Sequence, residues 1–195
     1  MANKKFSDFT SQDDLAQYNG LVGFDTGSDN LKITPNEFAN NFPLYLTGTV
    51  TNMFEGSSTR NFISFAYGTP TTNAGSVLQL GEKWKVTDAY FKWNANDVWP
   101  TFDPGETYSI GVYSLNNLSD DASNIANYTQ VGADIVEWTP TTQPTGGSYP
   151  YQVFSGLSYT LSPGTIYAFI GIESGTFTPT NKDPNFTVRL IRDFT

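Results

Sequence analysis

The chain has 195 residues, enough for one ordinary domain and an appendage, with 38% hydrophobic, 15% aromatic and 15% charged residues. It contains no Cys and no His, which excludes disulfides, thiolate nucleophiles, Cys/His zinc sites and imidazole acid–base chemistry. The formal net charge of -9 disfavours binding to nucleic acid or to an anionic membrane surface, because both would repel the protein.

The beginning of the chain carries no recognisable export or membrane signal. Lys4 and Lys5 are followed by polar residues instead of the apolar run that a signal peptide needs. No window of the sequence approaches the roughly 18 apolar residues of a membrane-spanning helix. We therefore expect synthesis in a cytoplasm, with no evident secretion signal for a later exit.

Residues 1–41 differ from the rest of the chain and are predicted to form an attachment arm. Residues 21–25 read as a short strand, a turn cluster follows at 26–30, and residues 31–34 alternate like the returning strand of a hairpin. A segment of this size cannot build its own core, so its apolar side chains need a partner surface. The predicted partner-binding residues are Phe6, Phe9, Leu15, Leu21, Phe24, Ile33 and Phe38.

Residues 42–195 are predicted to form one β domain. The abundance of Phe (15) and Tyr (11), with Gly (17) and Pro (11), is typical of strands joined by tight turns. The predicted strands span residues 45–52, 60–67, 76–79, 84–93, 107–115, 130–137, 151–157, 166–173 and 186–192. Strict alternation along 84–93 places Val86 and Tyr90 on the same face. A weak helical stretch is expected only within 118–128.

Two turns share a pattern that indicates how the chain re-enters the core. Residues 103–106 and 162–165 each contain Pro-Gly, follow an apolar residue, and precede a Tyr three positions after the Gly. The pattern predicts a turn feeding a central strand whose Tyr packs inside. Many short strands joined by such turns favour a β-sandwich or barrel.

No residue set is convincing as a catalytic or metal centre. Carboxylate pairs for glycoside hydrolysis would come from Asp97, Asp103, Glu106, Asp134 and Glu137, but turn carboxylates commonly bond their own backbone. Oxygen-rich turns at 25–29 and 120–121 lack the twelve-residue calcium-loop pattern, so solvated turn acids are the preferred interpretation. The sequence therefore predicts no enzyme, no metal and no cofactor.

Aromatic residues near predicted loops are candidates for stacking on sugar rings, because a flat apolar ring matches the face of a sugar. The alternative, which we prefer at this point, is core packing or a subunit contact. The candidate glycan-binding residues are Trp93, Trp99, Trp138, Tyr149 and Tyr151.

The opening of the chain resembles that of tailed-bacteriophage virion structural proteins. The resemblance lies in Met1-Ala2-Asn3-Lys4-Lys5, then Gly20-Leu21-Val22-Gly23-Phe24-Asp25, and Leu31-Lys32-Ile33-Thr34-Pro35. It implies a head fibre, capsid decoration or tail appendage that is made in the host cytoplasm and resides in the virion. Its implied partners are other virion proteins. We also expect self-association into a dimer or trimer, which would bury aromatic surface and protect strand edges. A host-surface glycan is a further candidate partner, suggested by the aromatic residues near loops.

A second resemblance concerns residues 64–174, whose order of predicted strands is similar to that of jelly-roll domains of surface and appendage proteins, including the choice-of-anchor type. These domains share a late motif that this chain matches with Leu161-Ser162-Pro163-Gly164-Thr165-Ile166-Tyr167. It implies a fold and no activity. The expected fold is thus all-β: a jelly-roll-like antiparallel β-sandwich preceded by an N-terminal anchoring arm. The alternative function is a carbohydrate-binding or receptor-binding module.

Overall fold

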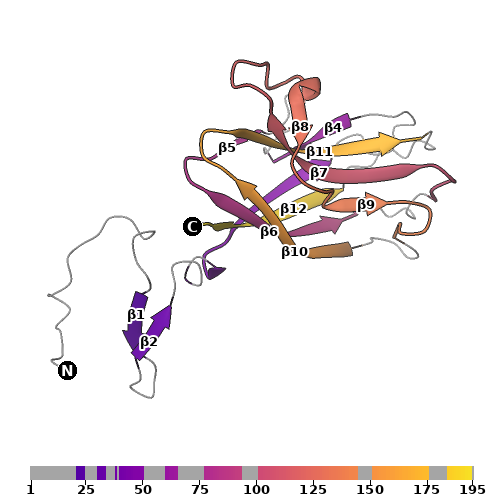
Figure 1. Ribbon diagram of the computed structural model, residues 1–195. Coiled ribbons are helices and arrows are strands. Elements are labelled where there is room, and N and C mark those ends of the chain that lie inside the picture. The colour runs from indigo at the N-terminus through magenta and orange to yellow at the C-terminus, as the bar shows by residue number, and fades with distance from the viewer. Residues whose placement is uncertain are drawn as a thin grey trace, which may run out of the picture.

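The computed structural model describes residues 21–24, 30–33, 38, 40–50, 60–65, 77–93, 101–144, 151–175 and 184–194 (Figure 1). These residues are almost entirely strands and turns, which confirms the all-β prediction. The strands are β1 (Leu21–Phe24), β2 (Asn30–Ile33), β3 (Leu44–Val50), β4 (Arg60–Ser64), β5 (Val77–Gln79), β6 (Trp84–Lys92), β7 (Thr107–Leu115), β8 (Tyr128–Gln130), β9 (Val136–Trp138), β10 (Tyr151–Leu161), β11 (Ile166–Ser174) and β12 (Asn185–Arg192).

The strand order defines a jelly roll. One layer runs β10-β6-β12-β3; the other runs β4-β11-β7-β8, with β5 pairing β11 and β9 pairing β7. Every pairing is antiparallel, and β3 and β4 connect the layers through the Thr49–Ser64 and Val50–Ile63 pairs. If β4 with β5, and β8 with β9, each count as one position, the layers read 6-3-8-1 and 2-7-4-5. This is the interleaved order of two Greek keys.

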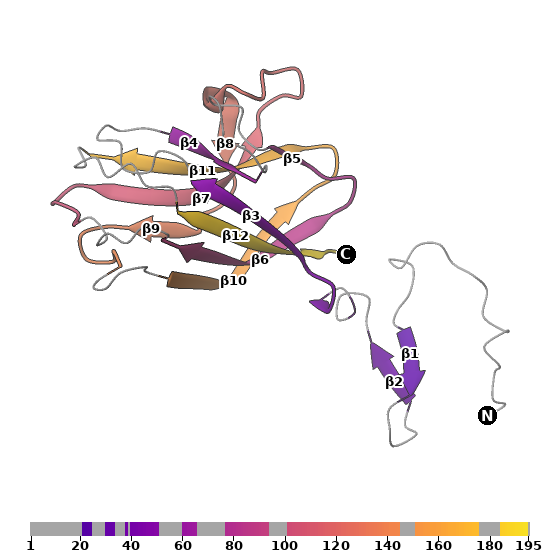
Figure 2. The same cartoon turned by 180° about the vertical axis from the view of Figure 1, so that it is seen from behind.

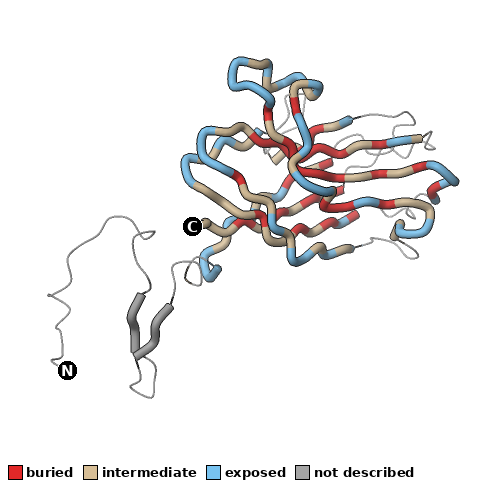
Figure 3. The backbone as a smooth tube through the Cα atoms, in the orientation of Figure 1, coloured by how far each residue is buried: buried red, intermediate tan, exposed pale blue. Residues whose placement is uncertain are grey.

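The core lies between the two layers, and buried residues recur along the strands of both (Figure 3). Phe91 of β6 and Phe186 of β12 face Phe169 and Ile110 of the opposite layer's strands. Phe169 and Phe186 lie 6.1 Å apart between ring centroids. Burying rings of this size between the sheets supplies most of the favourable free energy of folding.

Both Pro-Gly turns form as predicted. In the first, the Glu106 amide donates to the Asp103 carbonyl at 3.0 Å, and Gly105 takes φ +94°, a conformation that glycine adopts without strain. The following tyrosine, Tyr108, is buried. The second turn delivers Tyr167 to the core, where its hydroxyl accepts a hydrogen bond from the Ser162 amide at 3.0 Å.

Three local predictions need correction. The strand expected over 130–137 is two strands, β8 and β9, because the chain bends at Gly132, whose φ is +76°. The helix expected within 118–128 is a single 3-10 turn, Ile125–Asn127. Side-chain oxygens there bond nearby amides instead: Asp121 accepts from the Ser123 amide at 2.9 Å, and Asn124 from the Ala126 amide at 3.1 Å. Such local bonds compete with a helix.

The third correction concerns the alternation in β6. Opposite β12, Asp88 pairs with Arg189 while Val86 pairs with the very next residue, Leu190, so β6 carries one extra residue at Thr87. This β-bulge reverses the phase of the pleat. Val86 is therefore in the core, whereas Tyr90 lies on the outer face.

The jelly roll has two unlike ends (Figures 1 and 2). One end of the sandwich carries the first residue of β3, the last residue of β12 and the turns at 80–83 and 162–165. The connections after β3, β6, β9 and β11 all leave from the opposite end. The Lys83–Asp193 ion pair at 3.5 Å and the Asp193 amide bond to the Lys83 carbonyl at 2.9 Å tie the C-terminal segment to the first end.

Candidate functional site

Two of the five aromatic candidates are core residues. Trp93 and Trp138 are both buried. The Trp138 ring stacks on Tyr108 with centroids 5.7 Å apart, and its indole N–H donates to Gln152 Oε1 at 2.8 Å. These rings present no face to solvent, so the core-packing alternative holds for both.

Of the other three aromatic candidates, Tyr151 is 57% exposed at the start of β10. Trp99 and Tyr149 lie outside the described residues. The position of Tyr151 is informative because β10 is the edge of its layer, and its first residue pairs with Lys92 of β6. It therefore belongs to the outer face of the β10-β6-β12-β3 layer.

The predicted arm residues are described only in part. Phe6, Phe9 and Leu15 lie outside the described residues. Leu21, Phe24 and Ile33 fall on β1 and β2, which form a separate antiparallel hairpin in which Leu21 pairs with Ile33 in the strand register. Phe38 is half-buried, with its ring 4.9 Å from that of Phe42. The role of these seven residues in partner binding stays a prediction.

The root of the arm is tied to the jelly roll by one side chain. Arg189 of β12 donates from Nη2 to the Asn40 carbonyl at 2.9 Å. Its Nη1 donates to Thr87 Oγ1 at 2.9 Å and lies 3.2 Å from Asp88 Oδ2. Arg189 thus connects the last residues of the arm to two residues of β6.

The outer face of the β10-β6-β12-β3 layer is defined here as the tyrosine face. Pairing across the four strands places its residues in rows: Val153, Tyr90, Thr187 and Thr47 form one row. The neighbouring rows are Tyr151, Lys92, Asn185, Thr49 and Ser155, Asp88, Arg189, Tyr45. Tyr45, Tyr151 and Val153 rank among the most exposed large hydrophobic side chains of the described chain.

Tyr90 lies between the other two tyrosines of this face, Tyr151 of β10 and Tyr45 of β3. The Tyr45 and Tyr90 rings lie 6.5 Å apart between centroids, tilted by 45°. Burial raises the pKa of the Tyr90 hydroxyl above its usual value, and the negative charge of Asp88 raises it further. Tyr151 lies diagonally across the β10–β6 pair from Tyr90, because Tyr90 pairs with Val153.

The outer face of the second layer is largely covered by its own loop. Phe62, Tyr113 and Tyr128 form a small second core beneath residues 116–127, with Phe62 and Tyr128 rings 5.4 Å apart. Arg60 lies over the Tyr113 ring at 5.3 Å, a cation–π contact.

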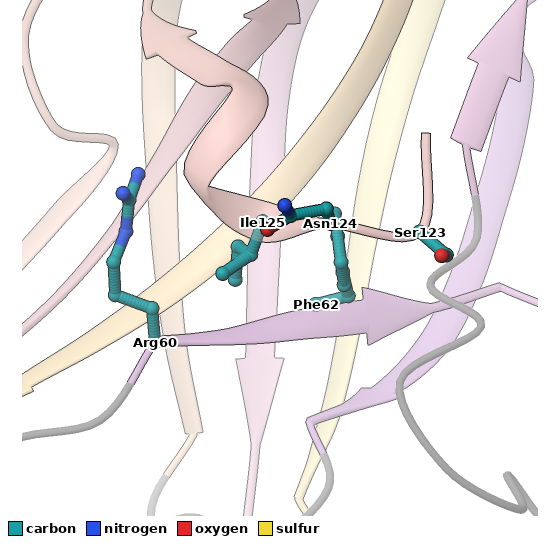
Figure 4. A pocket seen from close by; sticks show the side chains of 5 residues that line it. All are labelled: Arg60, Phe62, Ser123, Asn124 and Ile125. Atoms are coloured by element: carbon teal, nitrogen blue, oxygen red, sulfur yellow. The ribbon is translucent and has the colours of Figure 1, made fainter. Parts of the chain in front are cut away.

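A shallow depression of about 130 Å³ lies beside this small core (Figure 4). Arg60 and Phe62 of β4 form one side, and Ser123, Asn124 and Ile125 of the covering loop form the other. Its volume is well below the ~300–1,000 Å³ of a typical ligand pocket. The depression is therefore a weak candidate for a binding site.

The described carboxylates have structural environments. Glu106 Oε2 accepts from the Asp103 amide at 2.7 Å, so the Glu106 side chain closes its own turn. Asp134 Oδ1 accepts from Gln130 Nε2 at 2.8 Å, and burial raises the pKa of the Asp134 carboxyl. Glu137 is exposed on β9, and Asp97 lies outside the described residues. None of these contacts assembles two carboxylates around a cleft.

In the part of the chain that the structure describes, no group of three or more Asp, Glu, His or Cys side chains is placed to hold a metal ion. No helix in those ranges is long and apolar enough to span a membrane.

Comparisons with known proteins add no relative. No protein-family model matches the chain. No curated protein matches its sequence. The fold alone therefore defines the class of this protein: an all-β jelly-roll sandwich.

Proposed function

We propose that this chain is a non-enzymatic structural protein of a bacteriophage virion, namely a head fibre, capsid decoration or tail appendage. In this proposal residues 1–41 dock on another virion protein and the jelly roll is displayed. Self-association into a dimer or trimer is part of the same proposal, since further copies would shield strand edges.

The observation that supports the proposal most directly is the polarity of the jelly roll. The arm joins β3 at the end where Arg189 binds the Asn40 carbonyl, while four connections leave from the opposite end. A module attached at the first end would present those connections outward. Loops on a rigid scaffold are where binding residues concentrate.

Removal of the arm tests the proposal. A variant lacking residues 1–37 keeps Phe38, Asn40 and Phe42, and with them the contacts to Arg189 and between the two Phe rings. The full-length protein is expected to co-sediment with phage particles that lack this component, and the shortened variant is expected to stay in the supernatant. Equal melting temperatures of the two proteins would show that the jelly roll is intact in both.

The alternative outcomes are equally informative. If the shortened variant sediments as well as the full-length protein, the arm is not the attachment segment. If neither protein sediments, the virion assignment is overturned.

One observation favours a second candidate function, carbohydrate or receptor binding. Tyr151 is exposed on an outer sheet face, diagonally across the β10–β6 pair from Tyr90, whose ring lies 6.5 Å from that of Tyr45. The two functions are compatible, because an appendage that displays several copies strengthens a weak contact.

A further inference from the structure

We propose that the tyrosine face binds an acidic polysaccharide chain, with Tyr45, Tyr90 and Tyr151 as its stacking residues. The inference deepens the display role proposed above and names a surface and a ligand class for it. It relies on the displayed jelly roll, not on the arm.

The three tyrosines form a diagonal strip. Tyr151 of β10 pairs with Lys92, whereas Tyr90 pairs with Val153, two residues further along β10. Tyr45 of β3 pairs with Arg189, which pairs with Asp88, a further two residues along β6. With strands ~4.8 Å apart and a rise of ~3.4 Å per residue, the backbone positions of the three tyrosines span a path of roughly 20 Å. The Tyr45 and Tyr90 rings themselves approach to 6.5 Å, so the rings suit a short run of sugars.

The side chains beside the strip suit a hydroxylated ligand better than a protein surface. Tyr rings offer an apolar face with a polar hydroxyl at the tip. Thr47 and Thr187, whose hydroxyls are 2.9 Å apart, and the amide of Asn185 add hydrogen-bonding groups beside the strip. Val153 is the one aliphatic side chain in the three rows. The centre of a protein–protein interface is usually depleted of charged residues and more apolar than this.

The charge of the face points to an anionic chain. Between Trp93 and Asn181 the sequence has eight Asp and Glu residues and no Lys or Arg. The tyrosine face instead carries Lys92 in the row of Tyr151, and its one described acid, Asp88, is paired with Arg189. A carboxylate-bearing sugar lying along the tyrosines would therefore meet Lys92 as its cation.

The same charge distribution argues against a second copy on this face. A face-to-face contact related by a twofold axis would place Lys92 of each copy on the same surface, where the two like charges repel. Light scattering separates a polysaccharide from a second copy as the occupant of this face, because it measures the mass of the protein in solution.

The test is titration calorimetry of the full-length protein with sodium alginate, a polyuronate, and with neutral dextran. Binding to alginate that weakens with added salt is expected, with no heat from dextran. Tyr151→Ala, Tyr45→Ala and Tyr90→Ala should each raise Kd by between about twofold and tenfold. Lys92→Ala should weaken binding and flatten the salt dependence. Leu118→Ala, which removes an equally exposed side chain from the loop over the other layer, should change nothing.

Three results would overturn the inference. The first is that titration with alginate releases no heat. The second is that the Kd for alginate is unchanged in all three tyrosine variants. The third is a wild-type oligomer, seen by light scattering, that the Tyr45→Ala and Tyr151→Ala variants convert to monomers, because the face would then belong to a contact between copies. None of these results depends on the co-sedimentation experiment, so each proposal can be contradicted without affecting the test of the other.

Discussion

Glu106 shows how a carboxylate that resembles half of a catalytic pair in sequence is used by the fold. Its Oε2 accepts from the Asp103 amide, and the Glu106 amide in turn bonds the Asp103 carbonyl. The side chain is buried beside Gly175, where a methyl group would contact the Glu106 side chain. Spacing in the sequence marks this turn correctly, but only the contacts distinguish a turn-closing acid from a catalytic one.

Removing this side chain should destabilise the protein. Glu106→Ala leaves the Asp103 amide without its acceptor and opens a gap at Gly175, so we expect a loss of about 1–3 kcal/mol in the free energy of unfolding, measured in urea. Glu106→Gln keeps an acceptor oxygen and should lose less. Glu137→Ala, at an exposed position of β9, is the matched control. Equal losses in Glu106→Ala and Glu137→Ala would contradict the turn-closing role.

Asp134 gives a prediction with a definite pH dependence. Burial raises the pKa of its carboxyl in the folded protein above the ordinary value of 3.8. A raised carboxyl pKa means that the folded state holds the proton more tightly, so the stability linked to this group is present at low pH and lost as pH rises through the folded pKa. Asp134→Asn should therefore raise Tm at pH 7 and have little effect below about pH 3.8. A Tm gain of equal size at both pH values would contradict this assignment.

At the scale of elements, β6 shows where alternation fails as a guide. Its polar and apolar residues suggest one uninterrupted strand, yet the extra residue at Thr87 moves Val86 into the core and leaves Tyr90 outside. A bulge of this kind depends on the partner strand, in which Arg189 and Leu190 are neighbours. The partner lies about a hundred positions further along the chain, so local pattern carries no signal of it.

The two layers are joined where β3 pairs with β4, and this junction leaves no room for a side chain at Gly48. Gly48 of β3 lies against the Ser64 carbonyl of β4, and a Cβ at Gly48 would overlap that oxygen. Gly48→Ala should force β3 and β4 apart and lower the free energy of unfolding by about 1–3 kcal/mol, as overpacking does. Gly81→Ala is the control, because a Cβ there meets nothing within 4 Å. Comparable urea midpoints for the two variants would show that the junction is not closely packed.

At the scale of the whole molecule, strand positions were predictable and strand partners were not. Runs of β-branched and aromatic residues between Pro-Gly turns locate β7 and β11 to within a residue. The tyrosine face is different, since Tyr45, Tyr90 and Tyr151 come from three strands that meet only through the interleaved jelly-roll order. The sequence points to Tyr151 because it lies near a loop, and not to Tyr45 and Tyr90, because a tyrosine within a predicted strand ordinarily indicates core.

The two ends of the jelly roll yield a last prediction about its orientation in an assembly. The chain has no Cys, so a single introduced Cys can be labelled uniquely with a maleimide. Ser162→Cys places it at the end where the arm joins β3, and Thr101→Cys at the opposite end; both positions are exposed. If the arm docks on a larger particle, assembly should slow labelling of Ser162→Cys and leave Thr101→Cys as reactive as in the free protein. Slower labelling at Thr101→Cys alone would mean that the jelly roll attaches by its other end, and that the connections after β3, β6, β9 and β11 face the particle instead of solvent.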